Sequence, residues 1–292
     1  MQKILNNKLI LGTVQMGLPY GINNNSGKIS LQNSIEILEY AFNNGIETLD
    51  SAESYGNAHE VIGIFHNENP DKIFKVITKL PHQINDDIVK KVDLYLKELN
   101  VTQLDTLMFH SYASYKANIR NFDILKRLKL DKKIKNLGVS VYTNNEIEKV
   151  LLNDNVDVIQ LPFNIFDNLN LRSEVLQKAK SKGKIIHTRS VLLQGLFFKK
   201  LDDVNKTVQS LKNELIQLHS ISNNNKLSIS ELALGYCLNQ KYIDNTLIGV
   251  DSIDQLKENL ESSNLKLGIE VMSKINSIKV NNLNLLNPSL WK

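Results

Sequence analysis

The sequence predicts an α/β fold, a closed (β/α)8 or TIM barrel, and two observations favour it. Short runs rich in β-branched residues alternate with amphipathic stretches along all 292 residues. These runs are continuously apolar, which is typical of parallel strands buried on both faces. Eight of them can be counted, as a closed barrel requires. One barrel of about 250 residues suits this length, so we expect a single domain over residues 1–292.

The elements follow in order along the chain. The expected strands are residues 8–15, 46–52, 73–80, 104–110, 134–141, 156–163, 184–191 and 245–250. Apolar residues recur at helical spacing in 30–45, 86–100 and 252–263, and the first of these has a Ser/Asn start and a Gly stop. A doubly wound sheet would need a G-x-G-x-x-G turn after the first strand, and LGTVQMGLPYG does not supply it.

Two segments are expected in addition to the eight strand–helix units of the barrel. Residues 203–222 predict an extra helix between the seventh strand and the helix that belongs to it, and residues 270–292 predict a last helix and a tail. We expect the asparagine-rich segments 23–26 and 223–226 to be loops.

Composition excludes several classes of protein. Hydrophobic residues make up 42% of the chain and charged residues 23%, as in ordinary globular proteins. No apolar run approaches the roughly 20 residues that span a bilayer, and the first residues lack the shape of a signal peptide, so we expect a cytoplasmic protein with no membrane partner. The lysines behind the net charge of +4 are dispersed, which disfavours a nucleic-acid partner.

Metal and disulfide chemistry are also disfavoured. The single cysteine, Cys237, excludes an internal disulfide framework and a cysteine-rich zinc site, and we expect it to be a buried, inert thiol. The six histidines are scattered without ligand spacing, so we predict no metal site.

Polar side chains close several of the apolar runs. Asp50 ends the second expected strand, Lys79 the third and His110 the fourth, while Tyr55 follows Asp50 by five residues. Taken singly, each has an ordinary explanation: a helix cap, a solvated lysine, a structural histidine. In a barrel, however, the carboxyl ends of the strands share one rim, where catalytic residues lie.

The chemistry of these four groups fits one type of reaction. A tyrosine has a pKa of about 10, a nearby ammonium lowers that pKa, and a carboxylate offsets the burial of the ammonium. A histidine beside the phenol can hydrogen-bond to a substrate oxygen. The set can therefore deliver a proton to a carbonyl oxygen or remove one from an alcohol.

With these residues placed, the chain resembles the aldo-keto reductases over nearly its whole length. The motifs LGTVQMG, IETLDSAESYG, VITKL, LMFHS, LGVSV, VIQLPFN, RSVLLQGLF and LIGVDSIDQLKEN stand in the order of that family. The resemblance implies a (β/α)8 barrel that transfers hydride from NAD(P)H to a carbonyl carbon. It implies the tetrad Asp50, Tyr55, Lys79 and His110, with Tyr55 as proton donor, Lys79 and Asp50 as its tuning pair and His110 as the orienting group.

The same resemblance implies the cofactor contacts. Thr13 would lie near the nicotinamide ribose, Asp50 would also contact the cofactor, and Ser140 and Gln160 would hold the carboxamide. Val141 stands where relatives often have asparagine. The loop around the pyrophosphate would comprise Ser190, Leu192, Gln194 and Gly195, and the adenosine end would comprise Gly249, Asp251, Gln255, Glu258 and Asn259.

Three positions depart from relatives. Arg189 stands where many have an aromatic residue against the nicotinamide, and we interpret it as favouring carbonyl reduction or as holding an anionic substrate, unless it pairs with a carboxylate. The carboxylate of Asp251 would repel the 2′-phosphate of NADPH, although Lys257 is near enough in sequence to offset that charge. Because relatives commonly prefer NADPH, the resemblance favours NADPH slightly over NADH. His59 in YGNAHE is expected on a helix and solvated.

The substrate is the least determined feature. Short loops suggest an open pocket that Tyr20, Tyr112, Tyr115 and Phe166 could line, and the motifs are similar to those of a bacterial branch linked with surface-polysaccharide sugars. A small carbonyl compound, including a sugar or sugar nucleotide, is therefore expected. Two alternatives stay open: a nucleotide-binding regulatory barrel with little turnover, and a redox-neutral, aldolase-like barrel in which Lys79 forms a Schiff base.

Overall fold

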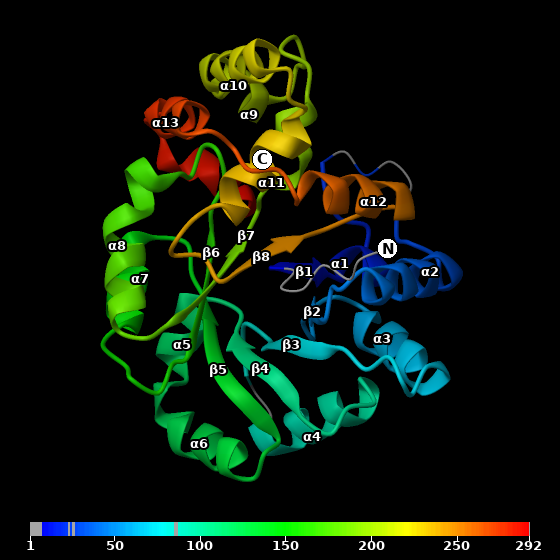
Figure 1. The fold of residues 1–292 in the computed structure, drawn as a ribbon. Coiled ribbons are helices and arrows are strands. Elements are labelled where there is room, and N and C mark those ends of the chain that lie inside the picture. The colour runs from blue at the N-terminus through cyan, green and yellow to red at the C-terminus, as the bar shows by residue number, and fades with distance from the viewer. Residues whose placement is uncertain (1–7, 23, 25–26, 85–86, 292) are drawn as a thin grey trace.

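Eight parallel strands form a closed barrel in chain order, as predicted (Figure 1). The computed structural model describes residues 8–22, 24, 27–84 and 87–291. Pairing of Leu9 with Thr246 and of Leu11 with Ile248 closes the barrel between the first and last strands. The strands are β1 (Leu9–Gly12), β2 (Thr48–Asp50), β3 (Lys75–Leu80), β4 (Leu104–Phe109), β5 (Ile134–Ser140), β6 (Val158–Pro162), β7 (Ile185–Arg189) and β8 (Asn245–Ile248).

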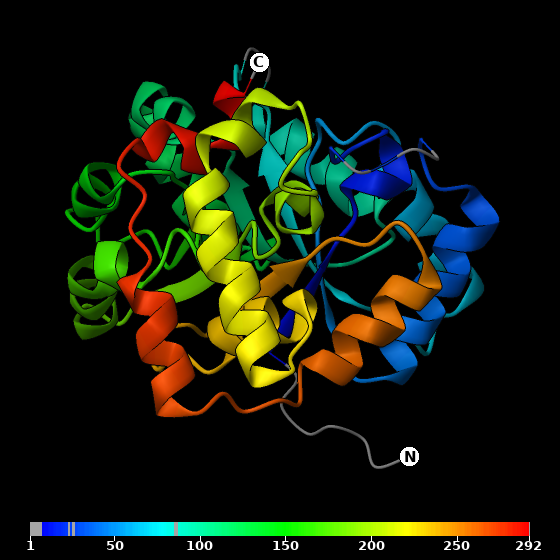
Figure 2. The same ribbon diagram turned by 90° about the horizontal axis from the view of Figure 1, so that it is seen from above.

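A helix follows each strand and covers the outside of the barrel (Figures 1 and 2). In Figure 2, the last of these helices lies beside the first, so the helical layer also closes. The eight are α2 (Leu31–Asn43), α3 (Ala58–Glu68), α4 (Ile88–Glu98), α6 (Phe122–Leu130), α7 (Asn144–Val150), α8 (Leu169–Ser181), α11 (Ile229–Leu238) and α12 (Ile253–Ser262).

Helix starts follow the capping residues of the sequence. Ser30 accepts a hydrogen bond from the backbone N–H of Asn33 at the start of α2, and Asp87 accepts one from Val89 at the start of α4. Thr143 and Ser228 each form a capping box with the glutamate three residues later, Glu146 or Glu231. These caps fix where the chain leaves each loop.

The first expected strand was too long. The backbone N–H and the hydroxyl of Thr13 both donate to the carbonyl oxygen of Asp50, which turns the chain after Gly12 into the short helix α1 (Val14–Gly17). Residues 13–15 therefore belong to the carboxyl-end rim of the barrel rather than to β1.

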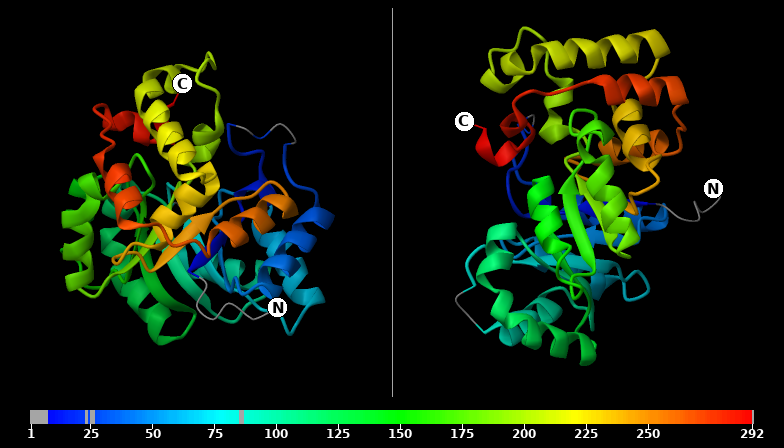
Figure 3. Two further views of the ribbon diagram at one scale, coloured as in Figure 1. Left: turned by 45° about the horizontal axis from the view of Figure 1, so that its top comes forward. Right: turned by 90° about the vertical axis from the view of Figure 1, so that its left-hand side faces the viewer.

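The extra segments lie outside the ring of barrel helices. Helices α9 (Lys206–Ser210) and α10 (Lys212–Asn225) follow β7, and α10 packs outside α11 and α13 (Ile269–Ser277) (Figure 3). This confirms the predicted extra helix. The tail continues in the 3-10 turns η3 (Leu283–Leu286) and η4 (Pro288–Leu290). Shorter pieces after β4 and β7 are α5 (Tyr112–Ala117), η1 (Ile119–Asn121) and η2 (Leu193–Phe198).

The expectation of a loop at residues 223–226 was wrong. Asn223 to Asn225 form the last turn of α10, because buried Ile221 anchors that turn and the side chain of Asn225 donates to the carbonyl oxygen of Ile221. The helix ends at Lys226, which has a left-handed φ of 52°. Of the other asparagine-rich segment, residues 23 and 25–26 lie outside the described residues.

Two glycines bring the first and second rim loops into contact. A Cβ on Gly17 would lie 1.7 Å from the carbonyl oxygen of Tyr55 and 2.9 Å from the amide nitrogen of Ala58. Gly56 has φ +57°, and a Cβ there would lie 2.4 Å from the carbonyl oxygen of Gly17. Backbone atoms cannot give way as a flexible side chain can, so these glycines position the loop that carries Tyr55.

We therefore predict that Gly17→Ala lowers the free energy of unfolding by about 3 kcal/mol, because it overpacks a contact made by backbone atoms. Chemical denaturation measures the change. Gly268→Ala is the matched control, since φ is −65° at Gly268 and a Cβ there meets nothing within 4 Å. Equal, small changes in the free energy of unfolding in the two variants would show that the Gly17 contact does not limit the size of the side chain.

Candidate active site

Strand periodicity places polar side chains at the carboxyl end of the barrel interior. Ile77, Met108 and Val158 belong to a small apolar cluster inside the barrel. Side chains two residues apart on a strand share a face, so the positions two residues further on point into the rim above that cluster. They are filled by Lys79, His110 and Gln160.

A buried ion pair occupies this rim. The ammonium of Lys79 donates to Oδ1 of Asp50, and the two side chains are each only 2% exposed. The ammonium also donates to the carbonyl oxygen of Ser51 at 2.9 Å, and the amide of Gln160 donates to Oδ2 of Asp50 at 2.8 Å. Both charges are thus neutralised and hydrogen-bonded, which burial of charge requires.

Tyr55 lies beside this pair. Its hydroxyl oxygen is 3.5 Å from the ammonium nitrogen of Lys79, which also lies 5.0 Å from the centre of its ring. Burial raises the pKa of Tyr55 and the Lys79 charge lowers it, with burial prevailing, so the net shift is upward. The sequence had indicated only the downward effect of Lys79. The phenol therefore keeps its proton at neutral pH.

His110 completes the group, at the edge of Tyr55. The two rings meet edge to face with centres 5.8 Å apart, and Nδ1 of His110 is 3.4 Å from the hydroxyl oxygen of Ser54. Burial, followed by the charges of Lys79, His82 and Arg189, lowers the pKa of His110 to about 3. The imidazole is therefore neutral and can act as a hydrogen-bonding group.

His82 is a site residue that sequence reasoning missed. Its ring stacks on that of His110 with centres 4.6 Å apart and planes inclined by 17°. Its position, two residues beyond the end of β3, could have indicated that it lies at the rim. The stack covers one face of the His110 ring, which meets the Tyr55 ring edge to face.

His59 was expected to be solvated, and this was wrong. It is 5% exposed, with Nε2 2.7 Å from the hydroxyl oxygen of Thr78 and Nδ1 3.1 Å from a carboxylate oxygen of Glu98. Glu98 belongs to α4, so only the packed barrel brings the two together. Burial lowers the pKa of His59 more than Glu98 raises it. The hydrogen bond with His59 holds the side chain of Thr78, the strand residue that precedes Lys79.

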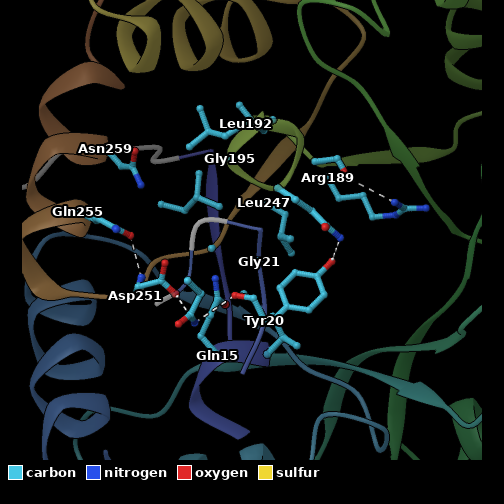
Figure 4. Close-up of a pocket in the computed structure, with 18 of the residues that line it drawn as sticks. Gln15, Tyr20, Gly21, Arg189, Leu192, Gly195, Leu247, Asp251, Gln255 and Asn259 are labelled. Carbon is cyan, nitrogen blue, oxygen red and sulfur yellow. Dashed lines mark hydrogen bonds between the residues drawn. The ribbon is translucent and has the colours of Figure 1, made fainter. Parts of the chain in front are cut away.

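A cavity of about 440 Å³ runs from Tyr55 along the rim between β1, β7 and β8. Figure 4 shows Arg189 at one end and Asp251, Gln255 and Asn259 at the other. Twelve of the expected cofactor residues line it: Asp50, Gln160, Arg189, Ser190, Leu192, Gln194, Gly195, Gly249, Asp251, Gln255, Glu258 and Asn259. Thr13 and Ser140 do not; Thr13 instead holds the carbonyl of Asp50, and Ser140 ends β5 beside Gln160.

Gln15 is a second residue that sequence reasoning missed. It lines the cavity, is 8% exposed, and its amide oxygen is buried without a hydrogen-bond partner. A Cβ on Gly249 would lie 2.8 Å from its amide nitrogen. The absence of a side chain at Gly249 therefore leaves the space that the Gln15 amide occupies beside the cavity.

Arg189 lies at the Tyr55 end of the cavity. Its guanidinium carbon is 4.1 Å from the centre of the Tyr142 ring, and its N–H groups reach the carbonyl oxygen of Val141 and the hydroxyl of Ser190 at 3.3 and 3.4 Å. Within the part of the chain that the structure describes, it forms no ion pair with a carboxylate. The alternative of a carboxylate-paired Arg189 is therefore not what the structure shows.

The far end of the cavity is acidic. Asp251 accepts a hydrogen bond from the side chain of Asn24 at 3.1 Å, and its backbone N–H donates to Gln255 at 2.8 Å. Burial raises the pKa of Asp251. The sequence suggested that Lys257 could offset the negative charge of Asp251, but the structure directs Lys257 elsewhere. Its ammonium pairs with Asp254 at 3.2 Å and lies toward the ring of Tyr40.

The loop after β7 crosses the cavity. It takes left-handed φ angles at Ser190, Leu193, Gln194 and Gly195, from 46° to 87°. The amide of Gln194 donates to the hydroxyl of Tyr20 at 2.7 Å, a hydrogen bond that joins this loop to the one after α1 (Figure 4). The bond thus links two loops that line the cavity.

Of the aromatic residues expected at a substrate pocket, only Tyr20 lines the cavity. Phe166 packs on Phe197 in the core with ring centres 4.9 Å apart. Tyr115 is buried against Phe109 and Phe122. Tyr112 is half-buried beside Tyr115.

Two further observations bear on the alternatives. A Schiff base needs a neutral, reachable amine, whereas Lys79 is buried; burial alone would lower its pKa, but Asp50 and Tyr55 outweigh burial and raise it. Cys237 is fully buried, as expected, and burial raises the pKa of its thiol.

Over the described ranges, no cluster of three His, Cys, Asp or Glu side chains could hold a metal ion. Nor is any helix among those residues long and apolar enough to cross a membrane.

Comparison with known proteins decides the family. Residues 8–280 match the model of the aldo/keto reductase family. The chain belongs to this family. Its members are NAD(P)H-dependent oxidoreductases, so the chain is an enzyme of this class with a nicotinamide cofactor and a small carbonyl substrate.

Relatives are distant but cover most of the chain. It is 24% identical to the uncharacterized oxidoreductase YqkF of Bacillus subtilis, with 80% of this chain and 83% of that protein covered. It is 23% identical to the NADH-specific methylglyoxal reductase of Escherichia coli, over 83% and 86%. The holo form of aldo-keto reductase AKR11C1 from Bacillus halodurans has the same fold, with TM-score 0.77, 19% identity and coverage of 93% and 91%.

The two pKa shifts predict the pH dependence of the reaction. Tyr55 holds its proton to above its ordinary pKa of 10.0, and His110 is neutral above about 3. We therefore expect kcat/KM for carbonyl reduction to stay level from about pH 5 to about pH 9 and to fall only in more alkaline solution. Steady-state rates across pH measure this, with His110→Gln as control. An inflection near pH 6.5 that His110→Gln removes would contradict a neutral His110.

Proposed function

We propose that this chain reduces the carbonyl group of a small aldehyde or ketone, with Tyr55 as proton donor and a bound nicotinamide cofactor as hydride donor. The supporting observation is the arrangement of one protonated phenol, one buried ammonium and one neutral imidazole around a single point of the rim. With the Asp50 carboxylate against the ammonium, four groups from separate parts of the sequence meet there.

Each residue has a separate task in this proposal. The edge of His110 holds the substrate carbonyl oxygen next to the Tyr55 hydroxyl, and Tyr55 gives its proton to that oxygen as negative charge develops on it. The Lys79 ammonium, 3.5 Å from the phenol oxygen, stabilises the resulting phenolate. Asp50 and Gln160 keep the ammonium charged and in place.

In this proposal the cavity holds the nicotinamide dinucleotide, and its polar lining supports that role. The buried amide oxygen of Gln15 needs a donor, which a ribose hydroxyl or a carboxamide provides. Gly12 and Gly249 line the cavity at the ends of β1 and β8. A Cβ on Gly12 would lie 3.3 Å from the carbonyl oxygen of Ile248, so this position leaves little room for a side chain. The bound cofactor supplies the hydride, and the chain orients it and excludes water.

The roles predict the effect of removing one oxygen atom. Tyr55→Phe should lower kcat for carbonyl reduction about a thousandfold, because general-acid catalysis contributes about 10² to 10⁴. Cofactor affinity should stay within about twofold. Tyr112→Phe is the control, because Tyr112 begins α5 after β4, packs beside Tyr115 and does not line the cavity. Comparable losses in both variants, or none in Tyr55→Phe, would exclude Tyr55 as proton donor.

For the cofactor we propose NADH over NADPH, against the slight preference that family habit suggested. Among the described residues that line the cavity, Arg189 is the one lysine or arginine, and it lies at the Tyr55 end. The far end presents Asp251 and Glu258, and Lys257 is directed elsewhere. A 2′-phosphate there would meet a carboxylate rather than a cation. The similar protein from Escherichia coli is named as NADH-specific.

This predicts the response to charge removal at the far end. Asp251→Asn should tighten NADPH binding about tenfold while changing NADH affinity less than threefold, as calorimetric titration would measure. Asp254→Asn is the matched control: its side chain is 86% exposed, pairs with Lys257 and does not line the cavity. Tighter binding of NADPH than NADH by the unmodified chain would contradict the proposal.

For the substrate we propose a small, polar carbonyl compound, with sugar-type aldehydes and ketones included. His82 and Ser54 border His110 and Tyr55 at one end of the cavity. Of the four aromatic residues expected at the substrate pocket, Tyr20 lines the cavity, while Tyr115 and Phe166 are packed in the core. Initial rates with methylglyoxal, with short sugars and with bulky apolar ketones test this order of preference.

A further inference from the structure

We infer that Arg189 makes the cavity selective for the reduced form of the nicotinamide cofactor, by placing an unbalanced positive charge at the end of the cavity where the chemistry takes place. The inference rests on the proposed function, and it adds a property of the site: how the enzyme discriminates between the cofactor that it must load and the product that it must release.

The first step is the location of the charge. Hydride and proton reach adjacent atoms of one carbonyl group, so the nicotinamide ring must lie at the Tyr55 end of the cavity. Arg189 lines the cavity near Tyr55, on whose pKa its charge acts. Asp251 lies at the end opposite Arg189 (Figure 4). The guanidinium and the nicotinamide ring therefore share one end of the same cavity.

The second step is the balance of charge. Arginine is charged at all working pH values. The other cation at this end, Lys79, is neutralised by Asp50, and the nearby Asp167 is paired with Arg172 at 2.6 Å. Arg189 has no such partner among the described residues; a tyrosine ring, a carbonyl oxygen and a hydroxyl hold it. One net positive charge remains.

The third step is the difference between the two redox forms. The oxidised nicotinamide ring carries a positive charge and the reduced ring carries none, while the rest of the cofactor is unchanged. A fixed cation disfavours only the oxidised ring. Reduced cofactor is then loaded even in the presence of oxidised cofactor, and the oxidised product is expelled. Tighter binding of the reduced form makes hydride donation by the bound cofactor less favourable by the same factor, so the gain lies in loading and release.

The test is the ratio of dissociation constants for NAD⁺ and NADH, measured by calorimetry on three proteins. In Arg189→Gln this ratio should fall about tenfold, equivalent to about 1.4 kcal/mol and to about 30 mV in the potential of the bound two-electron couple. Arg189→Lys, which keeps the charge, should retain most of the ratio. ADP-ribose, which lacks the nicotinamide, should bind all three proteins alike.

Each other result overturns the inference. An unchanged ratio in Arg189→Gln means that the charge does not reach the ring. Equal loss in Arg189→Gln and Arg189→Lys means that shape or stacking matters instead of charge. Weaker ADP-ribose binding in Arg189→Gln assigns the residue to the phosphates. If the unmodified chain binds neither NADH nor NAD⁺, the proposed function itself fails, which is a separate outcome.

Discussion

The buried ion pair between Lys79 and Asp50 is the interaction on which the site depends. An ammonium in the interior of an apolar barrel is tolerated only with a carboxylate against it and hydrogen bonds to its remaining protons. Asp50 comes from β2, the carbonyl of Ser51 from the residue after it, and the amide of Gln160 from β6, on the far side of the barrel. The ends of three strands must therefore meet at one point before Tyr55 has a charged neighbour. Loss of either partner would leave a single buried charge, a change that typically costs about 3–5 kcal/mol.

The barrel interior and the rim loops both surround the ion pair and the residues beside it. The interior cluster below it is small and apolar, and the side chains of Lys79 and Asp50 above it are almost fully buried. Burial is what raises the pKa of Tyr55 and lowers that of His110, and the same burial makes the charge of Lys79 effective over 3.5 Å. Gly17 and Gly56 hold the Tyr55 loop against the first loop by backbone contact. Exclusion of solvent is thus a common cause of the protonated phenol and the neutral imidazole beside the ammonium.

Much of this could be predicted from the sequence, because it depends on local patterns. Continuous apolar runs identified the strands, and polar residues that end them identified Asp50, Lys79 and His110. What could not be predicted depends on pairing across the fold. His59 is buried because Glu98 and Thr78, 39 and 19 residues away, satisfy its ring. Lys257 turns to Asp254 although it stands near Asp251 in the sequence. The phenol pKa rises because desolvation outweighs a charge, and a sequence shows the charge but not the desolvation. His82 and Gln15 were missed for the same reason: their partners come from other elements.

The central claim is that these groups form a working reductase and not a barrel that only binds nucleotide. The most direct measurement is a single turnover, in which protein loaded with one equivalent of NADH is mixed rapidly with small aldehydes and the nicotinamide absorbance is followed. The account predicts stoichiometric oxidation of the bound cofactor and formation of the alcohol, with a primary isotope effect when the transferred hydrogen is deuterium. Tight binding of NADH without oxidation by any aldehyde would contradict it and would leave a nucleotide-binding barrel.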